Sequence, residues 1–322
     1  MRTDGGLRIE PLFDLGDAAG EWDRLAQASG SPFATREWAT AWWDAFGAGR
    51  RLMSFTCRRP DGRLAAILPL CAASGELRFV GHRDADVLGP ICAPPDRPAV
   101  AAALRRVLRE SRTHYDVFVG DDLPVRAGWG TRIGAERRAR TSSPVLHADG
   151  WSAFLAARSA NFRQQVRRRE RRLDGELGLR FRLCDDPSRL DADLDTLFAL
   201  HAARWGEQRA FAGRTAAFHR TFAAAALRRG WLRLWIAELG GTPAAAWYGF
   251  RYGGVEWYYQ AGRDPRFDRL AVGFVLLAHT IRAALDDGIR EYRLLRGDEP
   301  YKARFANDDD PVETVALASD DA

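Results

Sequence analysis

The chain has 322 residues, of which 46% are hydrophobic and 28% charged, and its formal net charge is +5. That length is typical of two domains rather than of one hydrophobic core. No apolar run approaches the roughly 18 residues that a membrane-spanning helix needs, and the N-terminus lacks the apolar region of a signal peptide. The cysteines are widely spaced and form no CxxC pair, which excludes a disulfide framework or a zinc site by pattern. We therefore expect a cytoplasmic protein with reduced cysteines.

The first half of the chain predicts helices that alternate with short strands. Its predicted helices cover residues 21–28, 36–46 and about 100–108, and its predicted strands cover 52–57, 64–70, 77–80 and 115–119. Thr35 is placed to cap the helix that starts at Arg36. A Pro-Asp-Gly turn separates the first two strands and predicts that they pair. A loop-rich stretch at 120–150 is the candidate boundary between a domain of residues 1–145 and one of residues 146–322.

The second half repeats this order of helices, antiparallel strands, a helix and a strand. A predicted helix starts at Asn161, and others cover 190–205, a segment around 218–226 that Gly230 stops, and 273–287. Strands are predicted at 231–239, 243–252, 255–261 and 291–295. The Gly-Gly pairs at 240–241 and 253–254 predict tight hairpin turns between the first three of these strands.

A cluster of charges follows the last predicted strand. Residues 296–302 place Arg296, Asp298, Glu299, Tyr301 and Lys302 around one glycine and one proline. Groups of these kinds at a cleft can transfer protons and stabilise an oxyanion. The alternative is a solvated turn whose charges pair locally.

The order of elements resembles that of GNAT-type acyltransferases, and the residues resemble the CelD-type (cellulose-biosynthesis) branch, which is similar to the FemAB peptidyltransferases. The resemblance covers about residues 21–305 and is most specific in Leu-Arg-Gly-Asp-Glu-Pro-Tyr-Lys, which ends at Lys302. Weaker matching stretches lie at 31–38, 42–43, 61–70, 167–173, 200–205 and 258–262. The resemblance implies an α/β (α+β) fold of two fused GNAT-like halves, each a mixed, mostly antiparallel sheet flanked by helices. One departure is Arg293, which stands where the family usually has an Asp.

The resemblance also implies acetyl-CoA or another acyl-CoA as co-substrate. In GNAT enzymes the pyrophosphate of coenzyme A sits at the start of a helix, where unpaired N–H groups and the helix dipole attract phosphate. The residues expected to hold it are Arg269, Val272, Gly273 and Phe274, and the alternative for Gly273 is easier helix packing. No metal is expected, because no His, Cys or carboxylate cluster has ligand spacing.

Substrate binding is predicted for a helix and for the strand at 255–261. His201, Arg204 and Trp205 share one helix face through their i, i+3, i+4 spacing. A semi-buried structural histidine is the equally weighted alternative for His201. Tyr259, Gln260 and Arg296 complete the predicted substrate-binding set.

Strand alternation predicts Glu256, Tyr258 and Gln260 on one face and Tyr259 on the other. In GNAT enzymes this strand splays from its neighbour, and its backbone amides hold the thioester carbonyl. Glu256 is a possible proton relay, although a solvent-facing position is the favoured interpretation.

The catalytic assignments follow from the likeness to a FemAB turn. It implies that Lys302 faces the tetrahedral intermediate, that Glu299 accepts the amine proton and that Tyr301 donates to the leaving thiolate. Asp298 is the alternative base, although an Asp after a glycine more often closes a turn.

The predicted function is N-acyl transfer from coenzyme A to a primary amine of a small molecule or cell-envelope precursor. One alternative is a FemAB-type transferase that uses aminoacyl-tRNA, because the arginine run at 163–172 could bind phosphates. Glu170 lowers the positive charge of that run, and an arginine-rich run more commonly forms a solvated helix face. A second alternative is a non-catalytic binding protein on a decayed GNAT fold. The sequence does not name the acceptor, the acyl chain or the oligomeric state.

Overall fold

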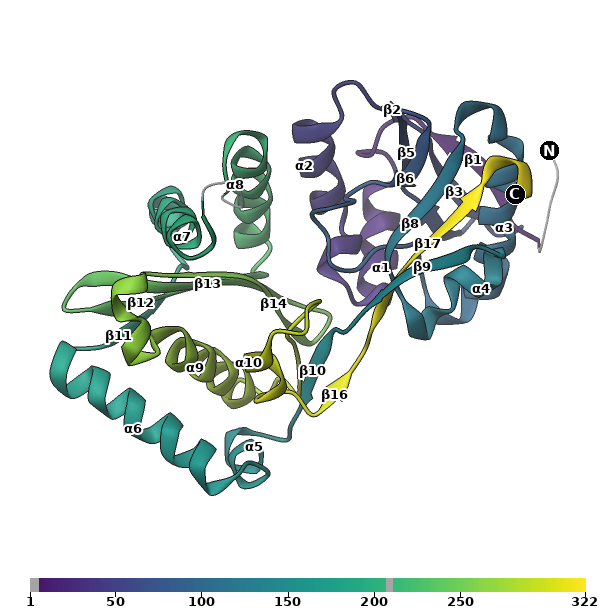
Figure 1. Cartoon of the computed structure of the whole chain (residues 1–322). Helices are drawn as coiled ribbons and strands as arrows, with labels where there is room; N and C mark the ends of the chain where they lie inside the picture. The colour runs from purple at the N-terminus through teal and green to yellow at the C-terminus, as the bar shows by residue number, and fades with distance from the viewer. Residues whose placement is uncertain (1–5, 207–210) are drawn as a thin grey trace. The chain divides into compact units, whose positions relative to one another are not determined.

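The computed structural model describes residues 6–206 and 211–322 and divides into two compact units (Figure 1). Unit 1 comprises Met1–Pro144, Arg296–Ala303 and Asp309–Ala322, and unit 2 comprises Val145–Leu295 and Arg304–Asp308. The predicted boundary between residues 145 and 146 assigned all later residues to the second domain. In the structure, the segments Arg296–Ala303 and Asp309–Ala322 belong to unit 1 instead.

Unit 1 contains two sheets. The four-stranded sheet has the order β1 (Arg8–Leu12), β3 (Ser54–Arg58), β4 (Leu64–Leu68), β7 (Ile91–Cys92). The six-stranded sheet has the order β2 (Arg51–Leu52), β5 (Leu70–Ala73), β6 (Glu76–Phe79), β8 (Val117–Pro124), β17 (Val312–Ala318), β9 (Glu136–Thr141). Its helices include α1 (Ala19–Ser29), α2 (Arg36–Phe46), α3 (Arg97–Glu110), α4 (Trp129–Ile133) and α10 (Pro300–Ala303). The predicted cap of α2 is confirmed, because the Thr35 hydroxyl accepts a hydrogen bond from the Trp38 amide at 3.3 Å.

Two predictions for unit 1 are wrong. The predicted strand 64–70 is divided at Pro69 into β4 and β5, which belong to different sheets. A proline has no N–H group to continue a ladder, so it marks the division. The predicted loop at 120–150 contains α4 and β9. Nearly every residue of β9 is exposed, so no apolar alternation reveals this strand.

Unit 2 is built on a mixed sheet. Its order is β11 (Arg180–Leu183), β12 (Leu232–Leu239), β13 (Thr242–Tyr252), β14 (Val255–Arg263), β15 (Glu291–Arg293), β10 (Pro144–His147), β16 (Asp308–Asp309). β14 and β15 are parallel, whereas β11 to β14 are successively antiparallel. Both predicted Gly-Gly hairpins are confirmed, because Leu239 pairs with Thr242 and Tyr252 pairs with Val255. The predicted fold class, with mixed and mostly antiparallel sheets flanked by helices, is also confirmed.

Helices cover both faces of this sheet. On one face lie α7 (Leu190–Trp205) and α8 (Gly213–Arg228), and on the other lie α6 (Ala160–Leu177) and α9 (Val272–Asp286) (Figure 1). The short helix α5 (Trp151–Ala156) precedes α6. The core side chains include Phe222 of α8 and Phe250 of β13, whose rings lie 5.1 Å apart. Within the described residues, no helix is both long and apolar enough to span a bilayer.

Candidate functional site

β14 loses one of its two neighbours halfway along its length. It pairs with β15 only from Val255 to Trp257, whereas its pairing with β13 continues to Arg263. In the described part of the chain, no strand therefore pairs with residues 258–263 on the β15 side. On that side the backbone N–H and C=O groups of these residues have no strand partner among the described residues. The splay that the family resemblance implies stays a prediction.

A β-bulge in β14 changes the predicted side-chain faces. Gly249 pairs with Tyr258, but the next residue of β13, Tyr248, pairs with Gln260, so Tyr259 is the extra residue. Tyr259 packs near the ring of Tyr248, and Gln260 hydrogen-bonds to His201 of α7. Both side chains therefore face α7 and α8. The predicted separation of Tyr259 from Gln260 is wrong, because strict alternation fails at a bulge.

Three predicted substrate-binding residues of α7 lie together at this bulge. The indole Nε1 of Trp205 donates to the carbonyl of Ala261 at 3.4 Å, and the Arg204 guanidinium lies 4.3 Å from the Trp205 ring centre. His201 is 5% exposed, and burial lowers the pKa of its imidazole. Its Nδ1 has no hydrogen-bond partner among the described residues. Burial disfavours protonation of this ring, and its Nδ1 is free to form a hydrogen bond.

The same cluster contains residues that the sequence did not single out. His219 of α8 is fully buried 5.4 Å from the ring of Tyr259, and burial lowers its pKa to about 3. The hydroxyl of Tyr248 is buried without a hydrogen-bond partner in the described residues. Neither residue belongs to a motif. Tyr248 reaches the cluster through the register of β13 with β14, and His219 reaches it because α8 packs against Tyr259.

The residues predicted to bind coenzyme A lie at the start of α9. Ala271 precedes the helix with a φ of 55° and no side-chain cap, and no acid lies in the first turn. Gly273 has room for a Cβ, which would lie 3.5 Å from Cδ of Arg263. Arg269 is exposed, and Val272 is buried. Phe274 packs its ring against Phe162 and Phe305, at 5.7 and 5.3 Å between ring centres.

Glu256 does not face solvent, so that favoured interpretation is wrong. It is 1% exposed and lies 2.8 Å from Nε of Arg251, which also bonds to Asp287. Burial raises the pKa of Glu256, and the charge of Arg251 opposes this. The side chain is engaged in a buried ion pair, which fits a structural role better than a proton relay.

Unit 1 holds the predicted catalytic residues Lys302, Glu299 and Tyr301. Lys302 is 4% exposed; its Nζ lies 2.9 Å from Oε2 of Glu299 and donates to the carbonyl of Arg296 at 2.6 Å. A Cβ on Gly297 would lie 2.4 Å from that Glu299 oxygen, so the turn needs glycine. Lys302 is also the only lysine in a sequence with 48 lysine and arginine residues in total.

Arg296 forms a bridge between two buried acids of unit 1. Its Nε lies 2.7 Å from Asp86 and its Nη1 lies 2.7 Å from Asp122. Burial raises the pKa of Asp86 to about 6, against the lowering effect of Arg296. Arg296 is therefore engaged by carboxylates within unit 1. Arg293 of β15, the departure from the family pattern, pairs with Glu291 at 2.6 Å.

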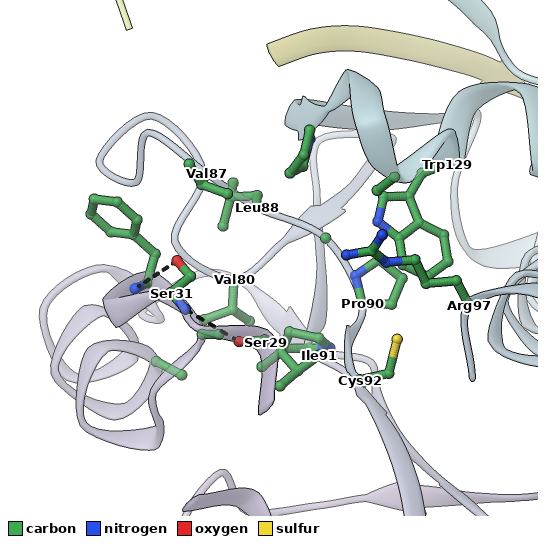
Figure 2. A pocket seen from close by; sticks show the side chains of 17 residues that line it. Ser29, Ser31, Val80, Val87, Leu88, Pro90, Ile91, Cys92, Arg97 and Trp129 are labelled. Atoms are coloured by element: carbon green, nitrogen blue, oxygen red, sulfur yellow. Dashed lines mark hydrogen bonds between the residues drawn. The ribbon is translucent and has the colours of Figure 1, made fainter. Parts of the chain in front are cut away.

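Unit 1 also contains a small apolar pocket of about 80 Å³ (Figure 2). Its lining includes Val80, Leu88, Ile91 and Trp129, with Arg97 as its charged side chain. None of the predicted site residues lines it. Across residues 6–206 and 211–322, no group of three or more His, Cys, Asp or Glu side chains is arranged to hold a metal ion.

Comparison with known proteins gives the family context. Residues 160–303 match the family model described as "Acetyltransferase (GNAT) domain". This chain has a GNAT-like fold. The match and the fold support a transferase of the GNAT acyltransferase type. No curated protein matches the sequence significantly.

Several solved structures share the fold at low sequence identity. A structure of FemX has a TM-score of 0.65 and 11% identity, covering 96% of this chain and 97% of that chain. The C-terminal domain of a putative lysylphosphatidylglycerol synthetase from Agrobacterium fabrum has a TM-score of 0.63 and 10% identity, covering 94% and 92%. A tandem GNAT protein from the clavulanic acid biosynthesis pathway has a TM-score of 0.56 and 15% identity, covering 97% and 98%. At these identities the likeness concerns the fold.

Proposed function

We propose that the protein is an N-acyltransferase that moves an acetyl or other acyl group from coenzyme A to a primary amine. The observation that supports this proposal is the end of the pairing between β14 and β15 at Trp257, because β14 itself continues to Arg263. A backbone N–H of residues 258–263 would bind the thioester carbonyl and stabilise the oxyanion that forms when the amine attacks. Donors placed in advance at such a position lower the barrier because they need no reorganisation.

The start of α9 would hold the pyrophosphate of the donor. The helix has 15 residues, its first turn contains no acid, and Gly273 leaves the backbone accessible. The partial positive charge of the helix N-terminus favours an anion there. Exposed Arg269 adds a formal charge beside it.

The acceptor amine would bind in the cluster formed by α7, α8 and the β14 bulge. Trp205 and Tyr259 offer apolar contact, and Gln260 and His201 offer hydrogen bonds. Because burial keeps the imidazole of His201 neutral, it can accept a hydrogen bond from an amine that has lost its proton. The family resemblance implies proton-accepting, oxyanion-stabilising and thiolate-protonating roles for Glu299, Lys302 and Tyr301, which belong to unit 1. The roles of Glu299 and Lys302 are tested separately below.

A binding measurement tests the donor assignment. Acetyl-CoA should raise the melting temperature, since a ligand at a hundred times its Kd stabilises the folded state by about 2.7 kcal/mol. Gly273→Glu should abolish that shift, because a carboxylate would lie against the pyrophosphate, whereas Gly273→Gln should keep part of it. Gly20→Glu is the matched control, because Gly20 lies in α1 with nothing within 4 Å of its Cβ position. A full shift in folded Gly273→Glu would contradict the assignment.

A second candidate function is aminoacyl transfer from aminoacyl-tRNA to an amine of a precursor. The observation that favours it is the exposed face of α6, where Arg163, Arg167, Arg168 and Arg171 form no salt bridge with the described residues. Arginines without carboxylate partners are available to phosphates. The test is binding of tRNA against salt concentration, argued in the Discussion.

A further inference from the structure

Unit 2 contains an open pocket of about 320 Å³ where α5 leads into α6. Two guanidinium groups line it, those of Arg158 and Arg304, together with Ser159, Asn161 and Gln165. The lining includes no acidic side chain. Its volume lies at the lower end of the range for small-ligand sites.

The polar side chains of this pocket are linked to one another. Gln165 donates to Oδ1 of Asn161 at 3.1 Å, and its own Oε1 accepts from Nη2 of Arg304 at 2.7 Å. The Arg304 guanidinium also lies 5.7 Å from the ring centre of Phe162 and 4.7 Å from that of Phe274. Arg304 is therefore held in place by Gln165 and by two aromatic rings.

The positive charge at the pocket is not neutralised by nearby acids. Arg158 uses its Nη atoms on the carbonyls of Phe305 and Ala306, and burial lowers its pKa. Arg169 lies 5.0 Å from the ring centre of Phe274, and its pKa is lowered by burial and then by the charge of Arg304. The acids of α6 are engaged elsewhere: Glu170 with Arg282, Asp174 with Arg180 and Glu176 with Arg172. Like charges held together at such a cost favour an anionic ligand.

Phe274 connects this pocket to the start of α9. It is the third residue of that helix, and both Arg169 and Arg304 lie against its ring. A ligand with two phosphate groups separated by a spacer would suit both places, since each offers positive charge or N–H groups to an anion. Coenzyme A has this chemistry, because its ribose separates the 3′-phosphate from the pyrophosphate.

We propose that the pocket lined by Arg158, Gln165 and Arg304 binds the 3′-phosphate of the coenzyme A donor. This inference rests on the proposed function, since it places the pyrophosphate of the same donor at the start of α9. Arg304 would contact the phosphate with its guanidinium fork, and Gln165 would hold Arg304 in position. The protein would therefore discriminate coenzyme A from 3′-dephospho-coenzyme A.

Calorimetric titration of the full chain with both ligands tests this inference. Wild-type protein should bind coenzyme A roughly ten- to a hundredfold more tightly than 3′-dephospho-coenzyme A, which is the range for one charge-assisted hydrogen-bonding contact. Arg304→Gln should lose most of this difference by weakening the binding of coenzyme A alone. Removing the 3′-phosphate from the ligand and replacing Arg304 in the protein should therefore be strongly non-additive in their effects on the binding free energy. Arg290→Gln is the control, because Arg290 is an exposed arginine of unit 2 outside the pocket.

The outcomes separate the inference from the proposed function. Equal affinity of wild-type protein for the two ligands, or an undiminished difference in Arg304→Gln, overturns the 3′-phosphate site while the acyl-CoA donor stands. No binding of either ligand overturns both. Arg304→Lys keeps the charge without the fork and should give an intermediate ratio, so it serves if Arg304→Gln unfolds. If tRNA competes for the pocket and Arg304→Gln removes only tRNA binding, the site belongs to RNA and the inference is wrong.

Discussion

The Nζ atom of Lys302 lies 2.9 Å from Oε2 of Glu299, and this ammonium group belongs to the only lysine of the chain. The sequence otherwise uses arginine wherever a cation is needed. A buried position that requires a compact ammonium group explains why an arginine does not stand here, because a guanidinium is larger and planar. The turn at Gly297 has no spare room, since a Cβ there would lie 3.0 Å from the same Nζ.

Lys302→Ala should therefore lower kcat roughly a hundredfold or more while donor affinity changes little, if the ammonium stabilises the oxyanion. Lys302→Arg should fail to restore turnover. A pooled screen of primary amines, with thiol release as the readout, supplies the assay. Full turnover per folded molecule in Lys302→Ala would contradict the catalytic role and show that the ion pair of Lys302 with Glu299 is structural. Glu299→Gln should flatten the acidic limb of the pH–rate profile. Glu110→Gln is its control, because it removes another ion-paired carboxylate of unit 1.

The single lysine also allows a chemical version of the same test. Acetylation by an N-hydroxysuccinimide ester removes the charge of amines, so it can reach Nζ of Lys302 and the N-terminal amine and leaves every arginine intact. We expect slow modification of Lys302, because its side chain is 6% exposed and ion-paired. Loss of turnover should follow the modification of Nζ measured by peptide mass spectrometry. Treatment at a lower pH, where only the N-terminal amine reacts, is the control. Activity that persists after Nζ is fully modified would contradict the catalytic role.

Gly262→Ala should destabilise unit 2 by several kcal/mol. The added Cβ would lie 2.3 Å from the backbone nitrogen of His201, so α7 would have to move away from β14. The same displacement should weaken acceptor binding through His201 and Gln260. Gly175→Ala is the control, since nothing lies within 4 Å of its Cβ position in α6, and it should be neutral or stabilising. Urea unfolding of both variants measures the difference.

Local features of the fold could be predicted from the sequence, whereas features that depend on long-range pairing could not. Thr35 and the Gly-Gly turns act within a few residues, so their patterns were sufficient. The partners of Arg296 could not be foreseen, because Asp122 lies 174 residues earlier in the chain. The same applies to β17, which enters the sheet of unit 1 between β8 and β9 from the far end of the sequence.

In the candidate site, too, local spacing could be predicted from the sequence and long-range pairing could not. The i, i+3, i+4 spacing in α7 was enough to group His201, Arg204 and Trp205. The bulge at Tyr259 was invisible because it arises from the register with β13, and it moves Gln260 onto the face of His201. The role of Arg304 depends on Phe274 of α9 and Gln165 of α6, which lie far from it in the sequence. The contacts that suggest a role for each of these residues form only when the chain has folded.

Stability should depend on pH through His279 of α9. Its ring stacks on Phe181 at 3.7 Å between ring centres and meets Trp235 edge-on, and burial lowers its pKa from 6.5 to about 4. The folded state therefore binds fewer protons than the unfolded state between these values. Its contribution to stability is present above pH 6.5 and is lost as the pH falls toward 4. His279→Phe should flatten this dependence in urea unfolding followed at several pH values. The surface variant His114→Phe should not, and an unchanged slope in His279→Phe would assign the effect to another group such as His219.

Salt dependence should decide whether the arginine face of α6 binds nucleic acid. Arg163, Arg167, Arg168 and Arg171 form no salt bridge with the described residues, so we expect them to attract RNA phosphates at low ionic strength. Four such contacts predict that affinity for bulk tRNA falls roughly 50- to 150-fold between 50 and 200 mM salt. Replacing Arg167 and Arg171 by glutamine should reduce that slope by about half in a gel-shift titration, whereas Arg290→Gln should leave it unchanged. No retardation even at the lowest salt would exclude aminoacyl-tRNA as the donor, and the calorimetric comparison of coenzyme A with its dephospho form would then carry the donor assignment alone.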